Sequence, residues 1–440
     1  MRSSLAPTLL LLSVASLACT TTSSRTSGKG MTPDRWETWS SRPTLQPVTE
    51  FRESSWRIES AGSASCHGGW DLHWDRIQPG KSYRIEVSCQ VFDVPAIHDS
   101  VLAELSWWTP QEKRADWARV RFERRGADLF DFAWEGQAPS ESTRATLRLA
   151  LRWTTAGKVS WRNPGVVEID APPARRVKAA LATGKFPGTG VEENLQFAIQ
   201  LINRAADAGA EVVCLPECIT SWGCEDLEKE GARPIPGPET DALCEIARRR
   251  DIDVVCSMNE LNGKLIHNTG LYIDAKRGIV GKYRKVHLSV GERRAGVIPG
   301  KEFPVWGTQY GKAGMLICYD NVHPEGHRIL AQKGAEVLFL PIMGDPRAVG
   351  EEAYLNWRRI MQVRAMDNHV WFIVCHNDGQ WGLIVRPDGK IVAEVDPSTG
   401  LAMAELDLRF RFDSWIGSDF ENRYWGERRP HLYGELVEDR

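Results

Sequence analysis

Two patterns of apolar and polar residues follow one another along the chain. Between residues 32 and 172, short segments with alternating apolar and polar residues recur, as at Tyr83–Ser88 and Ala145–Leu151. Turn residues such as Pro79-Gly80 separate these segments. Such alternation is typical of strands that bury one face, and its regular recurrence is typical of a sandwich. We therefore predict an all-β sandwich for this part of the chain.

A proline-rich stretch at 171–174 ends the first pattern, and the second pattern is that of an α/β domain. Val177–Ala182 predicts a strand. Apolar residues at helical spacing between 195 and 206 predict a helix that stops at Gly209, and Glu211–Leu215 predicts the next strand. Further strands are predicted at 252–257, 269–275, 312–318, 336–340, 370–375, 381–386 and 391–395, and helices at 239–250, 325–333 and 351–367. Helices that alternate with buried strands predict layers packed on a mixed sheet.

The chain has 440 residues, of which 42% are hydrophobic, and a formal net charge of −3. This length suits two or three domains, or one large domain with an appendage. The predicted organisation is the β-sandwich at 32–172, the α/β domain at 175–410 and a C-terminal extension at 411–440. Charges of both signs are interspersed, without the basic face or basic runs that nucleic-acid binding requires. No nucleic-acid partner is therefore expected.

The first 19 residues have the pattern of an export signal. Arg2 gives a positive start, Leu5–Ala15 is apolar, and small residues precede Cys19. The apolar run is too short for a stable membrane-spanning helix. The stretch resembles a bacterial lipoprotein signal, in which cleavage exposes Cys19 for acylation, and simple cleavage after Ala18 is the alternative. Residues 20–31 predict a Ser/Thr-rich tether, so we expect a protein of the bacterial cell envelope that touches the membrane only through a lipid anchor.

The ten cysteines suggest two different environments. Cys66 and Cys89 both lie in the first domain, where an oxidising envelope allows a disulfide but does not require one. Cys214, Cys256 and Cys375 lie within apolar strand-like runs and are predicted to be buried core thiols. No pair has C-x-x-C spacing, which argues against a zinc ribbon or a thioredoxin-like motif.

Three side chains with reactive chemistry lie at or just beyond the ends of predicted strands, where sites form in α/β sheets. Glu217 directly follows an apolar strand and is suited to act as a general base. Lys285 lies among four cationic or potentially cationic residues within Lys282–His287 and can stabilise an oxyanion if it turns inward. Cys318 follows an apolar run and can serve as a nucleophile. Each has an ordinary explanation when taken alone: a helix-capping acid, a solvated edge and a buried thiol.

Together, these stretches resemble the nitrilase superfamily. The order is the acid, then lysine within Tyr283–Leu288, then cysteine within Ile317-Cys318-Tyr319-Asp320 ahead of Pro324-Glu325. The framing motifs fit as well: His267-Asn268-Thr269, Gly291-Glu292 through Pro299-Gly300, Arg364–Asn368 and the Pro387-Asp388-Gly389 turn. The resemblance covers roughly residues 175–410. It implies a four-layer αββα sandwich, usually paired into homodimers or larger homo-oligomers.

The resemblance also implies a role for each residue. Glu217 takes the thiol proton, and Cys318 attacks the carbon of an amide, carbamoyl or nitrile group to form a thioester. Lys285 and the backbone N–H of Tyr319 stabilise the negative charge that forms. Glu292 matches a second glutamate that supports the lysine or the substrate. No metal and no organic cofactor are implied.

These features favour a hydrolase of small, non-peptide carbon–nitrogen bonds, with amide or carbamoyl substrates ahead of nitriles. Met343 and Asp345, in the loop after the next predicted strand, are expected to line the substrate pocket. Two alternatives remain open. One is a soluble acyltransferase in which an amine captures the same thioester, and the other is a non-catalytic envelope protein that binds glycans.

The tryptophan distribution bears on the glycan alternative. Eleven of the eighteen tryptophans lie within 32–172. Aromatic side chains on a β-sandwich can bind sugars, and this segment resembles the jelly roll of carbohydrate-binding modules. The alternative is that the tryptophans fill a small core and a contact between domains. A glycan partner is thus a hypothesis for this domain.

Overall fold

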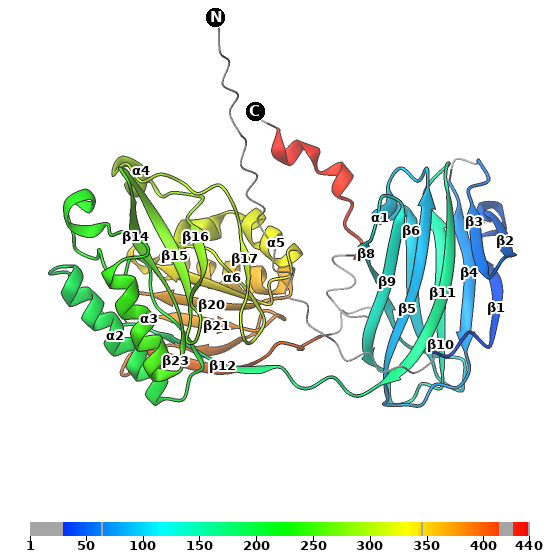
Figure 1. The fold of residues 1–440 in the computed structure, drawn as a ribbon, viewed down its shortest axis with the longest axis horizontal. Coiled ribbons are helices and arrows are strands. Elements are labelled where there is room, and N and C mark those ends of the chain that lie inside the picture. Colours follow the sequence, from blue (N-terminus) through cyan, green and yellow to red (C-terminus); the bar gives the residue numbers. More distant parts are fainter. Residues whose placement is uncertain are drawn as a thin grey trace, which may run out of the picture.

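The structure is a computed structural model, and it describes residues 30–62, 65–344, 346–377, 379, 381–412 and 426–438. The predictions made for the export signal, for Cys19, for most of the tether and for Asp345 lie outside these residues. The described chain forms an all-β body, blue to cyan in Figure 1, and an α/β body, green to orange. Within the described ranges, no helix has the length and apolar character needed to span a membrane.

The all-β body consists of two antiparallel sheets packed face to face, with strand orders β1-β4-β10-β6-β7 and β2-β3-β11-β5-β9-β8. The strands are β1 Arg35–Ser40, β2 Val48–Arg52, β3 Ser55–Glu59, β4 His67–Trp74, β5 Ser82–Phe92, β6 Val101–Trp108, β7 Arg114–Arg119, β8 Arg121–Arg124, β9 Leu129–Gln137, β10 Arg144–Arg152 and β11 Lys158–Ile169, with the short helix α1 at Ile97–Ser100. Trp74, Trp107 and Trp161 fill the core between the sheets, whereas Trp36 and Trp153 are exposed. The tryptophans therefore serve the core in part and the surface in part.

The buried cysteines are free thiols. Cys66 and Cys89 both lie in the core of the all-β body, and the structure leaves them unpaired. Burial raises the pKa of each of these two thiols, so both remain protonated. Cys214, Cys256 and Cys375 are fully buried in the α/β body, as predicted.

The α/β body begins directly after the linker at 170–175. Its strands are β12 Arg176–Ala182, β13 Val212–Cys214, β14 Asp253–Asn262, β15 Leu265–Asp274, β16 Gly278–Arg284, β17 Val305–Gly307, β18 Lys312–Met315, β19 Val337–Ile342, β20 Trp371–His376, β21 Gly382–Val385, β22 Ile391–Glu394 and β23 Leu401–Asp407. Its α-helices are α2 Val191–Asp207, α3 Pro238–Arg250, α4 Val290–Arg294, α5 Pro324–Gln332 and α6 Glu351–Asn368. Short helical turns lie at Leu227–Gly231, Cys318–Val322 and Pro346–Ala348 here, and at Pro43–Leu45, Pro430–Leu432 and Gly434–Val437 elsewhere.

Four layers make up the α/β body. Two six-stranded sheets, β16-β15-β14-β13-β12-β23 and β17-β18-β19-β20-β21-β22, stack face to face around a core that includes Leu181, Met315 and Phe339. Helices α2 and α3 cover the outer face of the first sheet, and α5 and α6 cover that of the second (Figure 1). The central strands β12, β13 and β14 run parallel, as do β18, β19 and β20. Each sheet therefore collects the carboxyl ends of three strands at one edge.

Helices α3, α5 and α6 lie within one residue of their predicted limits. The strand predicted at 312–318 is shorter than expected, because β18 ends at Met315 and Cys318 opens a 3-10 turn. The cause is Asp320, whose carboxylate accepts the N–H of Ile317 at 2.9 Å and so removes that residue from the strand ladder. Strands β16, β17 and β23 were not predicted.

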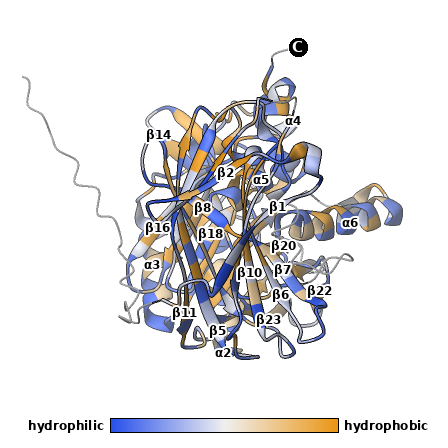
Figure 2. Cartoon of the chain, turned by 90° about the vertical axis from the view of Figure 1, so that its right-hand side faces the viewer, coloured by the Kyte–Doolittle hydropathy of each residue, from blue (hydrophilic) through white to orange (hydrophobic). Residues whose placement is uncertain are grey.

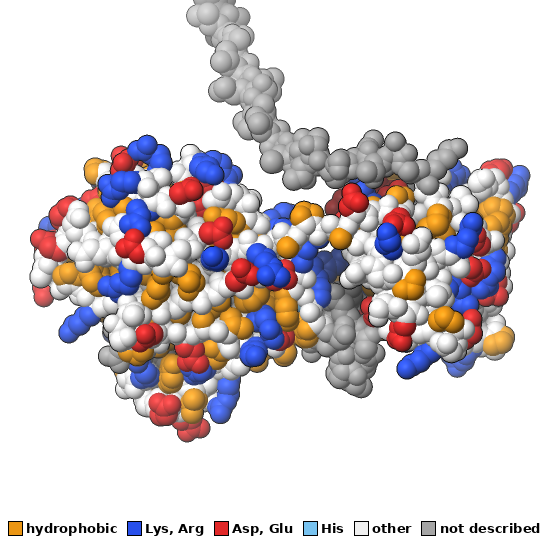
Figure 3. All heavy atoms as spheres, turned by 90° about the horizontal axis from the view of Figure 1, so that it is seen from below, with side chains coloured by type: hydrophobic (Ala, Val, Ile, Leu, Met, Phe, Trp, Pro, Cys, Tyr) orange, Lys and Arg blue, Asp and Glu red, His pale blue; other side chains and the backbone are white. Residues whose placement is uncertain are grey.

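The surface of the described chain mixes both signs of charge, as the face in Figure 3 shows. The described part of the C-terminal extension, red in Figure 1, meets the all-β body near its first residues and then runs away from that body. Its Arg429 Nε donates to the carboxylate of Asp99 at 3.0 Å, and this aspartate is almost fully buried. The described part of the extension thus contacts the all-β body through Arg429.

Candidate active site

Glu217, Lys285 and Cys318 come from three different strand ends and meet at one place. Pro216 cannot donate to a strand ladder, so the chain leaves the sheet after β13 and delivers Glu217. Lys285 directly follows β16, and its N–H donates to the Asn268 carbonyl at 2.8 Å. Its Nζ lies 2.9 Å from Glu217 Oε1, with 1% and 4% of the two side chains exposed. The predicted acid and lysine thus form a buried ion pair.

A second carboxylate completes this network. Lys285 Nζ also lies 2.8 Å from Glu292 Oε2, which the Ser289 N–H contacts at 2.8 Å. The side-chain amide of Asn268 donates to both acids, at 2.8 Å to Glu217 Oε1 and at 2.8 Å to Glu292 Oε1. The sequence pattern marked Asn268 only as part of a framing motif, because a neutral amide carries no signal of its own. In the structure it holds the two carboxylates in place.

The other oxygen of Glu217 is held by the backbone. Met343 N donates to Glu217 Oε2 at 2.8 Å, and the Met343 carbonyl lies 3.0 Å from His376 Nε2. Met343, predicted to line the substrate pocket, is thus placed beside Glu217 through its backbone. Glu217 has both oxygens occupied, which fixes the direction in which its carboxylate faces.

Lys285 and Glu292 stabilise each other's charges. Burial lowers the pKa of Lys285, but the charges of Glu217, Cys318 and Glu292 outweigh burial and raise that pKa above its ordinary value. Burial raises the pKa of Glu292, but Lys285 and the Asn268 amide outweigh it and lower that pKa. The site therefore keeps Lys285 as an ammonium at neutral pH, with the Glu292 carboxylate beside it.

The site favours the neutral form of Cys318, whereas it favours the charged forms of Lys285 and Glu292. Burial, with the charge of Glu217, raises the pKa of the Cys318 thiol to about 12, while Lys285 and hydrogen bonds from the Gly344 and Met343 backbone oppose this rise. The thiol is therefore protonated at neutral pH and needs a base to become a nucleophile. Its backbone is left-handed, with φ 45°, a conformation that a non-glycine residue adopts only where its surroundings impose it.

Tyr319 directly follows the thiol in the 3-10 turn, and 39% of its surface is exposed. The first N–H groups of a helical turn have no partner within the turn. The Tyr319 N–H is therefore suited to bind an oxyanion beside Cys318. A cavity of about 450 Å³ adjoins this residue and includes Val286 and His323 in its lining.

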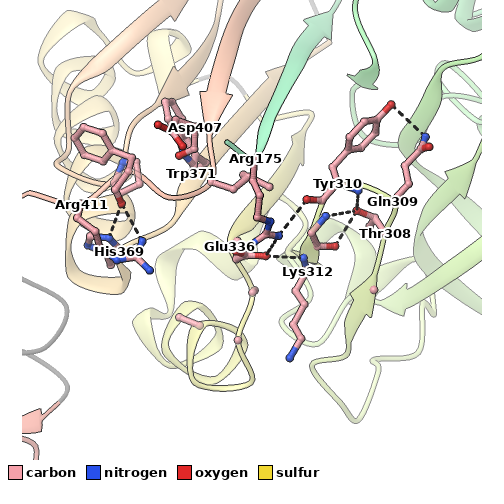
Figure 4. A pocket seen from close by; sticks show the side chains of 18 of the residues that line it. Arg175, Thr308, Gln309, Tyr310, Lys312, Glu336, His369, Trp371, Asp407 and Arg411 are labelled. Carbon is pink, nitrogen blue, oxygen red and sulfur yellow. Dashed lines mark hydrogen bonds and ion pairs between the residues drawn. The ribbon is translucent and has the colours of Figure 1, made fainter. Parts of the chain in front are cut away.

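Another, larger cavity lies elsewhere in the described chain. It has a volume of about 1010 Å³, and Figure 4 shows Arg175, Lys312 and Glu336 in its lining. Lys312 begins β18 and Glu336 precedes β19, so this cavity lies at the amino ends of the parallel strands. Cys318 lies beyond the carboxyl end of β18. This larger cavity and Cys318 therefore lie at opposite edges of the sheets.

Comparison with known proteins agrees with this fold. Omega-amidase NIT2-A of Xenopus laevis is 32% identical over 236 residues, which are 50% of this chain and 84% of that protein. N-carbamoylputrescine amidase of Solanum lycopersicum is 29% identical over 278 residues, 56% of this chain and 90% of that protein. The crystal structure of a carbon–nitrogen hydrolase from Helicobacter pylori G27 is 19% identical, with a TM-score of 0.52 over 60% of this chain and 99% of that one, and shows the same fold.

The stacked sheets and these relatives define an enzyme of the amidase and nitrilase superfamily. Residues 178–411 match the model of the carbon-nitrogen hydrolase family, and the chain belongs to that family.

Proposed function

We propose that this enzyme hydrolyses a small amide or N-carbamoyl compound, with nitriles as poorer substrates, through a thioester on Cys318. Relatives named for amidase activity on an ω-amide and on N-carbamoylputrescine support this substrate class. The observation that carries the proposal is the contact between Lys285 and Glu217, at 2.9 Å, beside a thiol that keeps its proton. A neutral thiol, a fixed base and a buried cation are what acyl transfer to sulfur requires.

The proposed reaction has two halves. Glu217 takes the proton of Cys318 as the sulfur attacks the carbonyl carbon, and the proton then passes to the leaving nitrogen. The C–N bond breaks, ammonia or an amine departs, and a thioester remains. Glu217 next takes a proton from water, which attacks the thioester carbon. The C–S bond breaks, the acid leaves, and the thiol regains its proton.

Negative charge forms on the carbonyl oxygen in both halves. Lys285 and the Tyr319 N–H are proposed to stabilise it, since a buried ammonium is worth more there than in water. Glu292 is proposed to keep Lys285 charged and aimed, through its contact at 2.8 Å. Met343 is proposed to border the substrate pocket.

Ammonia release from a panel of small amides, N-carbamoyl compounds and nitriles tests the proposal. We expect release by the wild type and none by Cys318→Ala. Cys244→Ala is the matched control, because Cys244 is a half-buried thiol on α3, outside the site. Equal release by the wild type and Cys318→Ala would contradict the assignment of the nucleophile. A product amide formed only when an amine is supplied would indicate acyl transfer.

We also propose that the enzyme forms a homodimer or a larger homo-oligomer. Leu355 and Val363 on α6 are 39% and 40% exposed, and Val349 just before it is 83% exposed. Figure 2 shows α6 projecting from the body. Gathered apolar residues at a surface indicate a partner. Sedimentation should show an assembly that Val363→Glu weakens and that Val48→Glu, at an exposed valine of the all-β body, leaves intact.

A glycan is proposed as the ligand of a β-sandwich domain at 32–172, distinct from the hydrolase domain at 175–410. Trp36 and Phe51 are 41% and 42% exposed, and their ring centroids lie 4.9 Å apart. Exposed aromatic faces are suited to sugar rings. Soluble oligosaccharides should bind the full chain and bind Trp36→Ala more weakly, with Val48→Ala as control. Equal binding by both variants would contradict this ligand site.

The proposed location is the bacterial cell envelope, with acylated Cys19 as the anchor. The support is the pattern of residues 1–19, a positive start, an apolar run and small residues before the cysteine. Full-length protein should incorporate labelled palmitate and fractionate with membranes, whereas Cys19→Ala should do neither. A cytoplasmic, unlabelled wild type would contradict the location.

A further inference from the structure

We propose that Asp320 is a positioning residue that sets Cys318 against Lys285, an inference that rests on the proposed function. Asp320 is the second residue after the thiol, and its side chain is fully buried. A buried carboxylate is costly unless hydrogen bonds satisfy it. The partners that satisfy this one come from the two segments that carry Lys285 and Cys318.

One oxygen of Asp320 joins the two segments. Oδ2 accepts the Tyr283 hydroxyl at 2.7 Å and the Ile317 N–H at 2.9 Å. Tyr283 lies on β16, two residues before Lys285, and Ile317 directly precedes Cys318. A single oxygen atom thus ties the strand that carries the lysine to the turn that carries the thiol.

The other oxygen holds the lysine segment from its far side. Asp320 Oδ1 accepts the His287 N–H at 2.8 Å and lies 2.8 Å from His287 Nδ1. His287 is the second residue after Lys285, so Asp320 holds the chain on both sides of the lysine, at Tyr283 and at His287. The imidazole of His323 stacks on that of His287, with ring centroids 4.0 Å apart. Movement of the lysine segment would have to break several of these contacts together.

Asp320 uses both of its side-chain oxygens as hydrogen-bond acceptors, which an asparagine cannot do. Each of its oxygens receives two contacts from donors or potential donors, so all of its accepting capacity is used. Asp320→Asn would replace one oxygen with an NH2 group, which faces donors and cannot accept. The substitution keeps the volume and removes the link on one side.

Loss of this link should affect the reaction more than binding. Cys318 is held in a left-handed conformation, with φ 45°, which persists only while its surroundings fix it. A displacement of about 1 Å between reacting groups costs roughly a hundredfold in rate. Substrate binding through other parts of the pocket does not depend on that alignment, so the effect should appear in kcat rather than in KM.

The test compares Asp320→Asn with a matched control, Asp274→Asn. Asp274 is 3% exposed and accepts the Lys276 and Arg277 N–H groups, each at 2.9 Å, at the turn between β15 and β16. We expect Asp320→Asn to lower kcat about ten- to a hundredfold with KM within twofold. Asp274→Asn should lower the melting temperature by about as much as Asp320→Asn does, and should leave kcat unchanged.

A second readout needs no substrate. The rate at which iodoacetamide alkylates Cys318, followed by peptide mass spectrometry, should fall at least fivefold in Asp320→Asn and stay unchanged in Asp274→Asn. Tyr283→Phe removes one of the four contacts and should give a smaller fall, which keeps the test decisive if Asp320→Asn does not fold. Wild-type alkylation and wild-type kcat in these variants would overturn the proposal. A wild type that hydrolyses no amide would instead count against the proposed function, while the alkylation comparison still decides this inference.

Discussion

Lys285 Nζ lies 2.9 Å from Glu217 Oε1, and both side chains are almost fully withdrawn from water. Sixty-eight residues separate them in the sequence, and the contact forms because β13 and β16 end at the same edge of one sheet, with β14 and β15 between them. A buried ion pair of this kind resists the loss of either member, because the remaining charge has no water to solvate it.

Lys285→Met should therefore cost stability as well as activity. It leaves the buried Glu217 and the partly buried Glu292 without their cation, and we expect a loss of about 3–5 kcal/mol in the free energy of unfolding. Urea denaturation measures this loss. The double variant Glu217→Gln with Lys285→Met should be destabilised by less than the sum of the single variants. Strict additivity would contradict a direct contact.

Lys282→Met is the matched control for that experiment. Lys282 lies on the same strand and pairs with Glu260, but 35% of its side chain is exposed and Glu260 keeps Arg284 as a partner. Its loss should cost less than half as much as the loss of Lys285 and leave the Cys318 chemistry intact. Equal costs at the two positions would show that burial does not set the size of the effect.

Asn268→Ala tests the amide that bridges the two acids. Removing hydrogen bonds to buried charged groups costs about 1.5–3 kcal/mol each, so we expect amide hydrolysis to fall about ten- to a hundredfold. Asn368→Ala is the control, since Asn368 is a buried asparagine outside the site whose side-chain amide donates to the Arg364 carbonyl of α6 at 2.8 Å. Full activity in Asn268→Ala would rule out a role for the bridge.

The sequence predicted most central elements because buried parallel strands read as apolar runs. It missed β16, whose outward Lys282 and Arg284 give it the appearance of a solvated edge. Both contact Glu260 on β14, which lies beyond β15 in the sheet, and no local pattern can show such a contact. The acid, lysine and thiol were identified as candidates because they lie at predicted strand ends and because their order and flanking motifs resemble the nitrilase superfamily.

Supporting residues were harder to find than reactive ones. Asn268 is a neutral amide, and its importance arises only from two acids 51 and 24 residues away. Asp320 stood in a motif but had no assigned partner, since Tyr283 and His287 reach it only after the two sheets have stacked. Roles that depend on tertiary contacts of this kind cannot be inferred from spacing.

Alkylation of Cys318 should depend on pH in a specific way. Its pKa is raised from 9.0 to about 12, so the thiol stays protonated in the folded enzyme across the neutral range. The rate with iodoacetamide should therefore rise steadily from pH 7 to pH 11 without reaching a plateau. A plateau near pH 7 or 8 would show a preformed thiolate and remove the need for Glu217 as base.

The raised pKa of Cys318 also predicts how the free energy of unfolding depends on pH. The folded state holds the Cys318 proton more tightly than the unfolded state does, so this contribution is complete below about pH 9 and is lost as the pH rises toward 12. The wild type should accordingly lose stability relative to Cys318→Ala over that window. Identical pH dependence of the two proteins, measured by urea denaturation, would contradict the raised pKa.

The contribution of Glu260 to stability should be lost at acidic pH, whereas that of Cys318 is lost at alkaline pH. Burial raises the pKa of Glu260, but hydrogen bonds from Arg284, Lys282 and Thr269 outweigh it and lower that pKa to about 2. Arg284 Nε and Nη2 each lie 2.9 Å from this carboxylate. A depressed carboxyl pKa stabilises the fold above the unfolded value of 4.5, and that stability is lost as the pH falls toward 2.

Glu260→Gln isolates this contribution, because glutamine keeps the shape and does not titrate. The stability difference between wild type and Glu260→Gln should be constant above pH 5 and shrink steadily between pH 4.5 and pH 2. Arg284 directly precedes Lys285, so the variant should also loosen the lysine segment and lower amide hydrolysis modestly at neutral pH. Glu405→Gln is the control, since Glu405 pairs with Arg176 at a site where both side chains are about half exposed. A stability difference that does not change with pH would show that the three donors do not hold the carboxylate in its charged form.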